Sequence, residues 1–137
     1  MVLRLKIQPG DYSVCRFEPT ADPAQLLNLC STSEFFSITR TRDEISVVRS
    51  SFAGEDTMRT THGDCSYKIE AGWRLIKVEG PLDFGLVGII HQISERLANA
   101  KVPLFVVSTF DTDYVLVKQD RLEDAVEALN HGNICVD

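Results

Sequence analysis

The chain has 137 residues, enough for one domain or two small ones with a buried core. Its formal net charge of −6 argues against binding to nucleic acid or anionic lipid, because both interactions need basic residues to neutralise phosphates. Gly or charged residues interrupt every apolar stretch, and the N-terminus lacks the apolar segment of a signal peptide. We therefore expect a cytoplasmic protein, with no membrane contact, that binds a small molecule or another protein.

The first half of the chain is expected to hold mainly strands. Residues 14–18 predict a strand, and residues 3–7 predict an additional one that would supply a missing sheet edge. A short helix is expected within 23–30, and 35–48 predicts two strands joined by a turn. Residues 51–70 show no helical periodicity, so this half lacks a second helix.

The second half begins with a strand, a loop and a helix. The strand is expected at 73–79 and the loop at 80–85. Apolar residues then recur every three or four positions, as on one face of an amphipathic helix: Leu86, Ile89, Ile90, Ile93, Leu97 and Ala100. Arg96 and Lys101 lie near its end, where a positive charge complements the helix dipole.

Two strands, a helix and a last strand follow. The strands and their turn occupy 106–117, and Asp120 is expected to cap the second helix. This helix ends before Gly132, and a short strand is expected at 134–136. Its apolar face comprises Leu122, Val126 and Leu129.

This order of elements predicts an α+β fold made of two ferredoxin-like βαββαβ modules. Each module would be an antiparallel sheet with its helices on one face. Segments 35–48 and 104–117 align without gaps, as expected of an internal repeat. The modules are expected at 1–68 and 69–137, the first being a degenerate copy.

A polar turn joins the strands of 106–117. Tight hairpins favour Asn-Gly or Asp-Gly at the turn. This one instead concentrates hydroxyls, two carboxylates and an aromatic ring: Ser108, Thr109, Phe110, Asp111, Thr112 and Asp113. Polar side chains at the end of rigid strands are well placed to bind a small molecule.

The cysteines and histidines predict no catalytic or metal site. The four cysteines are scattered without a CxxC pair, which favours reduced thiols: Cys15, Cys30, Cys65 and Cys135. A zinc site that uses them with His62, His91 or His131 stays open as an alternative, although the usual ligand spacing is absent. No nucleophile and base pattern or phosphate loop is recognisable, so we expect no enzyme activity and no cofactor.

Three segments carry a family resemblance. Residues 73–84 and 108–117 resemble the small bacterial tandem ACT-domain proteins, and 35–41 fits the first domain of that family. These proteins are similar in turn to the ACT domains of the eukaryotic cytosolic arginine sensor and of aspartate kinases. The resemblance implies a non-catalytic regulator whose βαββαβ modules pair side by side and bind an amino acid at a domain interface.

The resemblance also implies which residues contact the ligand. A loop would offer backbone groups to the ligand's α-carboxylate, and the start of the following helix favours an anion there; this loop is Asp83, Phe84, Gly85 and Leu86. The polar turn would supply hydroxyl and backbone contacts, with Asp113 at the ligand's cationic end: Ser108, Thr109, Phe110, Thr112 and Asp113. Ile38, Thr39 and Arg40 would contribute secondarily, because the first copy's turn is basic where the second is acidic.

The leading hypothesis is therefore an amino-acid sensor that forms a homodimer and acts on a regulated protein partner. A protein-interaction module with a vestigial ligand site is the second hypothesis. An RNA-binding domain, the third, shares the βαββαβ order but needs a basic surface and sheet aromatics that this chain lacks.

Overall fold

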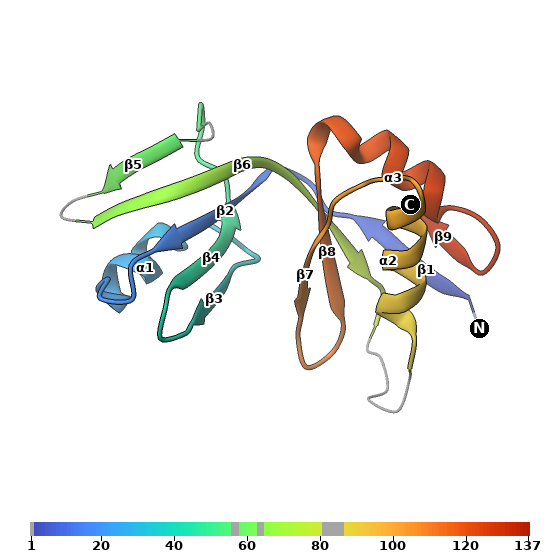
Figure 1. Ribbon diagram of the computed structural model, residues 1–137, viewed down its shortest axis with the longest axis horizontal. Coiled ribbons are helices and arrows are strands. Elements are labelled where there is room, and N and C mark those ends of the chain that lie inside the picture. Colours follow the sequence, from blue (N-terminus) through green and yellow to red (C-terminus); the bar gives the residue numbers. More distant parts are fainter. Residues whose placement is uncertain (1, 56–57, 63–64, 81–86) are drawn as a thin grey trace. The chain divides into compact units, whose positions relative to one another are not determined.

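The computed structural model describes residues 2–55, 58–62, 65–80 and 87–137. It contains two compact units (Figure 1), which we call the C-terminal unit (Met1–Pro9 with Arg74–Asp137) and the middle unit (Gly10–Trp73). The long strand β6, Cys65–Val78, takes part in both. Its first part pairs in the middle unit and its last part in the C-terminal unit.

The C-terminal unit is a five-stranded sheet with two helices. The strand order is β7-β8-β6-β1-β9, and β1 pairs antiparallel with β6 and parallel with β9. Helices α2 and α3 cover one face of this sheet (Figure 1). The bounds are Leu3–Ile7 (β1), Ile89–Asn99 (α2), Phe105–Ser108 (β7), Asp113–Lys118 (β8), Leu122–Leu129 (α3) and Ile134–Val136 (β9).

The core of the C-terminal unit lies between the sheet and its helices. Burial of apolar side chains from both layers is the main term that stabilises such a unit. Ile93 and Leu97 of α2 and Leu129 of α3 are fully buried. The sheet contributes Leu3, Leu5, Ile76, Val78, Val115, Val117 and Ile134.

Strand β1 lies inside this sheet, between β6 and β9, so the compact units differ from the predicted domains. The predicted boundary at 68/69 differs from the observed one between Trp73 and Arg74, and the first nine residues belong to the C-terminal unit. Alternation along β1 places Leu3 and Leu5 on the helix side of the sheet, where both are buried in the core. The strand itself pairs with β6 and β9. The strand predicted at 3–7 therefore completes the second module and not the first.

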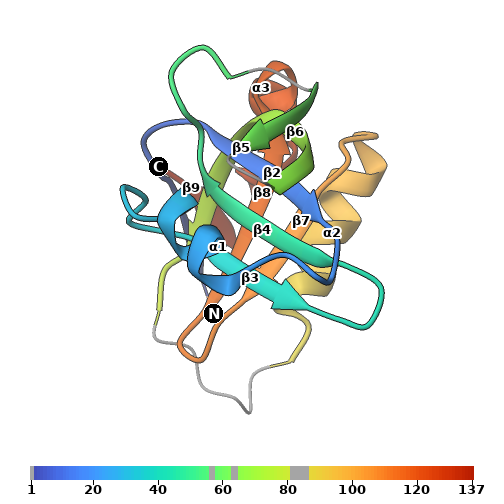
Figure 2. The same ribbon diagram turned by 90° about the vertical axis from the view of Figure 1, so that its left-hand side faces the viewer.

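The middle unit is a smaller version of the same arrangement. Its strand order is β3-β4-β2-β6-β5, and α1 packs on one face (Figure 2). Asp22 caps α1 by accepting from the backbone N–H of Ala24 at 3.0 Å, and Pro23 suits the first helical position. The bounds are Tyr12–Phe17 (β2), Pro23–Leu29 (α1), Ser37–Arg40 (β3), Ile45–Ser50 (β4) and Met58–His62 (β5).

The internal repeat is real, but the predicted alignment was wrong by one residue. Strands β3 and β4 have the same lengths as β7 and β8 and begin 68 positions earlier. A one-residue slip moves every side chain to the other face of a sheet. With the corrected spacing Val47 matches Val115, and both lie in the cores under the helices.

The second predicted helix begins differently from the expectation. A short 3-10 turn, η1 (Gln119–Arg121), precedes α3, so Asp120 lies within that turn and does not cap the helix. The buried face of α3 consists of Ala125 and Leu129, with Leu122 packed beside them. Of the three residues predicted for this face, Leu129 is fully buried, whereas Leu122 and Val126 are both half-buried.

No helix in the described part of the chain is long and apolar enough to cross a membrane. Within the same residues, no cluster of three or more His, Cys, Asp or Glu side chains is arranged to hold a metal ion.

Candidate functional site

The β7–β8 turn is held closed by its two threonines. The backbone N–H of Thr109 donates to the Thr112 carbonyl at 2.8 Å, and the Thr109 hydroxyl donates to the same carbonyl at 3.0 Å. The Thr112 N–H returns a bond to the Thr109 hydroxyl at 3.3 Å. Between these residues Phe110 is 80% exposed. The turn therefore presents an aromatic ring to its surroundings on a rigid frame.

Asp113 is the first residue of β8 and stands directly opposite Ser108, the last residue of β7. The Ser108 hydroxyl donates to an Asp113 carboxylate oxygen at 2.7 Å. Alternation along β8 places Asp113 on the side of Val115 and Val117, which face the helices. Its counterpart in the middle unit, Ile45, is a buried core residue. A half-buried carboxylate thus replaces a core side chain at this end of the sheet.

Thr112 fixes the turn to the end of β6. Thr112 is buried, and its hydroxyl donates to the Val78 carbonyl at the last position of β6. The chain re-enters the described structure at Val87, and Gly88 precedes α2 in a left-handed conformation with φ of 80°. Glycine has no side chain that could satisfy the first N–H groups of the helix. Figure 1 shows the turn and the start of α2 at the same end of the C-terminal unit.

Two further groups of residues were predicted for the site. Asp83, Phe84, Gly85 and Leu86 lie outside the described residues. Ile38, Thr39 and Arg40 belong to β3 of the middle unit, where Ile38 packs against the core and the other two are exposed. The structure therefore groups Ser108, Thr109, Phe110, Thr112 and Asp113 on one turn.

The β3–β4 turn repeats the frame of the β7–β8 turn with different side chains. Thr41 donates its N–H to the Glu44 carbonyl at 2.9 Å, and the Glu44 N–H donates to the Thr41 hydroxyl at 3.2 Å. In the corrected alignment Arg42 matches Phe110, and Asp43 matches Asp111. Both turns thus carry an aspartate at the third position, so the difference between them lies in Arg42, Glu44 and the residue that opens the next strand.

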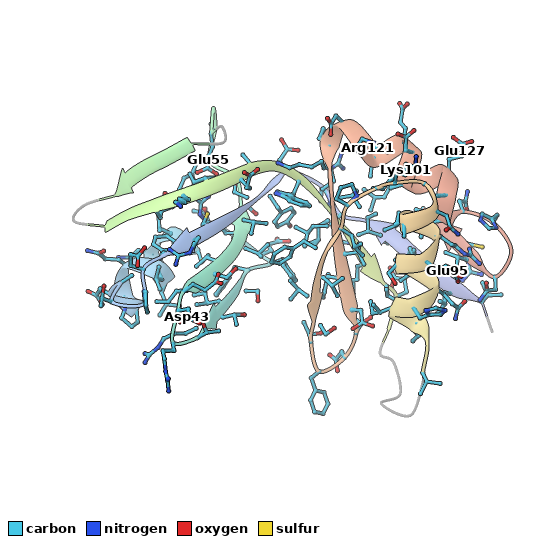
Figure 3. The ribbon with its side chains drawn as sticks, viewed as in Figure 1. Asp43, Glu55, Glu95, Lys101, Arg121 and Glu127 are labelled. Atoms are coloured by element: carbon cyan, nitrogen blue, oxygen red, sulfur yellow. The ribbon has the colours of Figure 1, made fainter. Side chains whose placement is uncertain are left out.

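A second polar cluster, in the middle unit, was not predicted. Arg49 of β4 is fully buried, and its guanidinium makes a bidentate ion pair with Glu55 at 3.0 and 2.8 Å. Glu55 is labelled in Figure 3. The Ser13 hydroxyl donates to Glu55 at 2.6 Å, and the Phe52 ring stacks on the guanidinium at 4.0 Å. The sequence signal was an arginine on the core-facing side of an apolar strand, at the position matching Val117.

Burial and charge set the protonation of this cluster. Burial alone would raise the pKa of Glu55, but hydrogen bonds from Arg49 and Ser13 and the Arg49 charge together hold it below its ordinary value. Burial raises the pKa of the Cys15 thiol to about 12, although the Arg49 charge opposes this effect. At neutral pH the pair is therefore charged, and Cys15 is a protonated thiol of low reactivity.

Comparison with known proteins identifies the class to which the chain belongs. A model of the ACT domain matches residues 68–131, and a model described as an N-terminal domain matches residues 10–51. The chain is 30% identical over 102 residues to the human cytosolic arginine sensor for mTORC1 subunit 1. That match covers 72% of this chain and 30% of the sensor. Residues 68–131 therefore belong to the ACT-domain family.

Among solved structures, one relative matches the chain over its whole length. A protein of Agrobacterium tumefaciens is 30% identical, with a TM-score of 0.78 over 100% of this chain and 93% of its own. An aspartate kinase of Clostridium acetobutylicum matches 92% of this chain and 32% of the kinase, with a TM-score of 0.63. At 15% identity the kinase shares the fold alone.

Proposed function

We propose that this protein is a non-catalytic regulator that binds an amino acid at the end of the C-terminal unit's sheet. The observation that carries the proposal is Asp113, a carboxylate at the position where the middle unit has the core residue Ile45. A polar group in place of a core residue costs stability unless it is hydrogen-bonded, and such departures from the core pattern are expected at functional sites. The match of residues 68–131 to the ACT domain supports the same proposal.

The proposed ligand is an amino acid with a cationic side chain. Asp113, oriented by Ser108, would accept from the cationic end, because charge-assisted hydrogen bonds are the strong ones. The start of α2 and the preceding residues 83–86 would take the α-carboxylate, since a helix N-terminus favours an anion. Similarity to a protein named as an arginine sensor makes arginine the first ligand to test.

We further propose that ligand binding biases a homodimer in the cytoplasm toward one arrangement and that a protein partner responds to it. A ligand can shift such an equilibrium only by its differential affinity for the two states. Ile38, Thr39 and Arg40 are the proposed secondary contributors from the middle unit. A protein-interaction module with a vestigial ligand site is the second candidate, favoured by the exposed ring of Phe110.

A thermal-shift screen of the twenty common amino acids tests this proposal on protein that has been unfolded, dialysed and refolded. We expect a cationic amino acid to raise the melting temperature in a concentration-dependent way, because a ligand that binds only the folded state stabilises it. Absence of any shift at millimolar concentrations would favour the interaction module instead.

A further inference from the structure

The Arg49 cluster has the chemistry of a carboxylate-binding site. A buried arginine that binds both oxygens of a carboxylate is the usual arrangement for recognising that group. Here Arg49 donates to both oxygens of Glu55, and Ser13 adds a third bond at 2.6 Å. The N–H of Phe52 lies 3.4 Å from the same carboxylate. The carboxylate that fills this site is the chain's own.

The site has more donors than its occupant uses. The Arg49 Nε is buried and has no hydrogen-bond partner among the described residues. The other two guanidinium nitrogens each have a partner besides Glu55: Nη1 donates to the Ser50 carbonyl at 3.1 Å, and Nη2 lies 3.5 Å from the Tyr67 hydroxyl, at the limit of a hydrogen bond. Buried polar groups are almost always paired, so an unpaired donor on the arginine is a reason to expect a further acceptor.

The position of Glu55 explains how a carboxylate comes to fill this site. In the C-terminal unit β8 continues through η1 into α3, which covers Val117. In the middle unit β4 continues into residues 51–55, which carry Phe52 and Glu55 to Arg49. The ion pair thus lies at the strand position where the C-terminal unit has an apolar residue packed under α3.

We propose that Arg49, Ser13 and Phe52 form a second small-molecule site, specific for a carboxylate group, with Glu55 as its internal ligand. A competing carboxylate would displace Glu55 from Arg49 and so release residues 51–55 from β4. Such a competitor must bring contacts beyond its carboxylate, because Glu55 is tethered and acts at high effective concentration. This site is separate from the Asp113 turn and does not depend on it.

Truncation of Glu55 tests the assignment, with acetate as the probe. Glu55→Ala removes a CH2–COO⁻ fragment, which has the size of acetate. We expect this variant to melt below the wild type, and acetate to raise its melting temperature saturably by at least about 4 °C relative to chloride at equal ionic strength. The wild type should melt at the same temperature in both salts, because Glu55 occupies its site.

Two control variants separate this site from general salt effects. The double variant Arg49→Val with Glu55→Ala carries valine at position 49, as the C-terminal unit does at Val117. Acetate should have no specific effect on it. Glu18→Ala removes the partner of Arg16, an exposed pair whose side chains are 40% and 69% exposed, and should also not respond. An acetate response shared by either control, or its absence in Glu55→Ala, would overturn the proposal.

The outcome is also defined if Glu55→Ala does not fold in chloride. Refolding followed by circular dichroism should then recover the native spectrum in acetate. A variant that stays unfolded in both salts, while the double variant folds, would show that acetate cannot replace Glu55 and would equally overturn the proposal.

Discussion

Thr112 joins the β7–β8 turn to the rest of its sheet. Its side chain is buried and donates to the carbonyl of Val78. Thr112→Val keeps the shape but leaves that carbonyl without this donor, so we expect a loss of about 1–2 kcal/mol in the free energy of unfolding. Urea unfolding measures it. Thr109→Val removes a hydroxyl that makes two hydrogen bonds within the same turn, but Thr109 is exposed and water can replace them, so this change should cost less. An equal cost would contradict the role given to Thr112.

Glu55 should make stability depend on acidic pH. Its pKa is lower in the folded state than in the unfolded chain, so the unfolded state binds the proton first as pH falls. The stability that Glu55 contributes is complete above the ordinary glutamate value of about 4.3 and is lost as pH falls through the lower folded-state pKa.

Urea midpoints measured between about pH 2 and 7 check this dependence. The variant with Arg49→Val and Glu55→Ala keeps every other carboxylate and should show a shallower loss of stability in acid. Identical slopes for the two proteins would exclude a contribution from Glu55.

Local structure was predicted correctly around the polar turn, where a strand-turn-strand unit is observed, whereas the ligand role of its residues stays a prediction. The polar turn, its hydroxyls and Asp113 were recognisable because short-range spacing defines a strand-turn-strand unit. The Arg49–Glu55 pair was not recognisable, because its partners Ser13 and Tyr67 come from distant parts of the chain. The place of Arg49 on the core-facing side of an apolar strand was a local signal, but the partners that bury it depend on tertiary contacts.

At the scale of elements, the two helices of the C-terminal unit cap each other. Arg96 of α2 donates to the carbonyl of Leu129, the last residue of α3, at 2.9 Å and to that of His131, just beyond it, at 2.7 Å. Arg121, just before α3, donates to the carbonyls of Lys101 and Ala100 beyond the end of α2, at 3.1 and 3.3 Å (Figure 3). The sequence placed Arg96 correctly near a helix end, but its guanidinium binds the C-terminus of the other helix.

Lys101 ends α2 in a conformation that suits glycine. Its φ is 59°, its N–H donates to Ala98, and the N–H of Val102 donates to Leu97 at 2.8 Å, which is the Schellman arrangement. A residue with a Cβ is strained at such a φ. We expect Lys101→Gly to raise the free energy of unfolding by about 0.5–1 kcal/mol, measured by urea unfolding.

Lys101→Ala is the matched control, because it removes the same charge and retains the Cβ. It should bring no stabilisation. If alanine stabilised as much as glycine, loss of the charge and not relief of the backbone would be the cause.

The order of helices and strands was more predictable than the pairing of the strands. The strand at 3–7 was expected from its alternation, yet the strands with which it pairs were not, because pairing depends on which core has an open position. The repeat was found but placed one residue out of register, since 35–48 and 104–117 are both apolar on either side of the turn. Only the observed strand bounds fix that register.

At the scale of the whole molecule, the chain contains two units with the same strand arrangement but with different helices and polar groups. The C-terminal unit has two helices and a carboxylate at the end of its sheet, whereas the middle unit has one helix and an internal ion pair. A duplicated fold lets one copy diverge while the other keeps its site. We infer that the Asp113 turn holds the main amino-acid site and that the middle unit carries the separate carboxylate site proposed at Arg49.

Isothermal titration of L-arginine into the wild type, Asp113→Ala and Asp111→Ala tests this claim most directly. Both variants remove one carboxylate from the same turn, but only Asp113 accepts from Ser108 and faces the helix side. The wild type and Asp111→Ala should bind, and Asp113→Ala should bind about tenfold or more weakly, the effect of losing one charge-assisted hydrogen bond. Equal affinity in all three proteins, or no binding to the wild type, would contradict it.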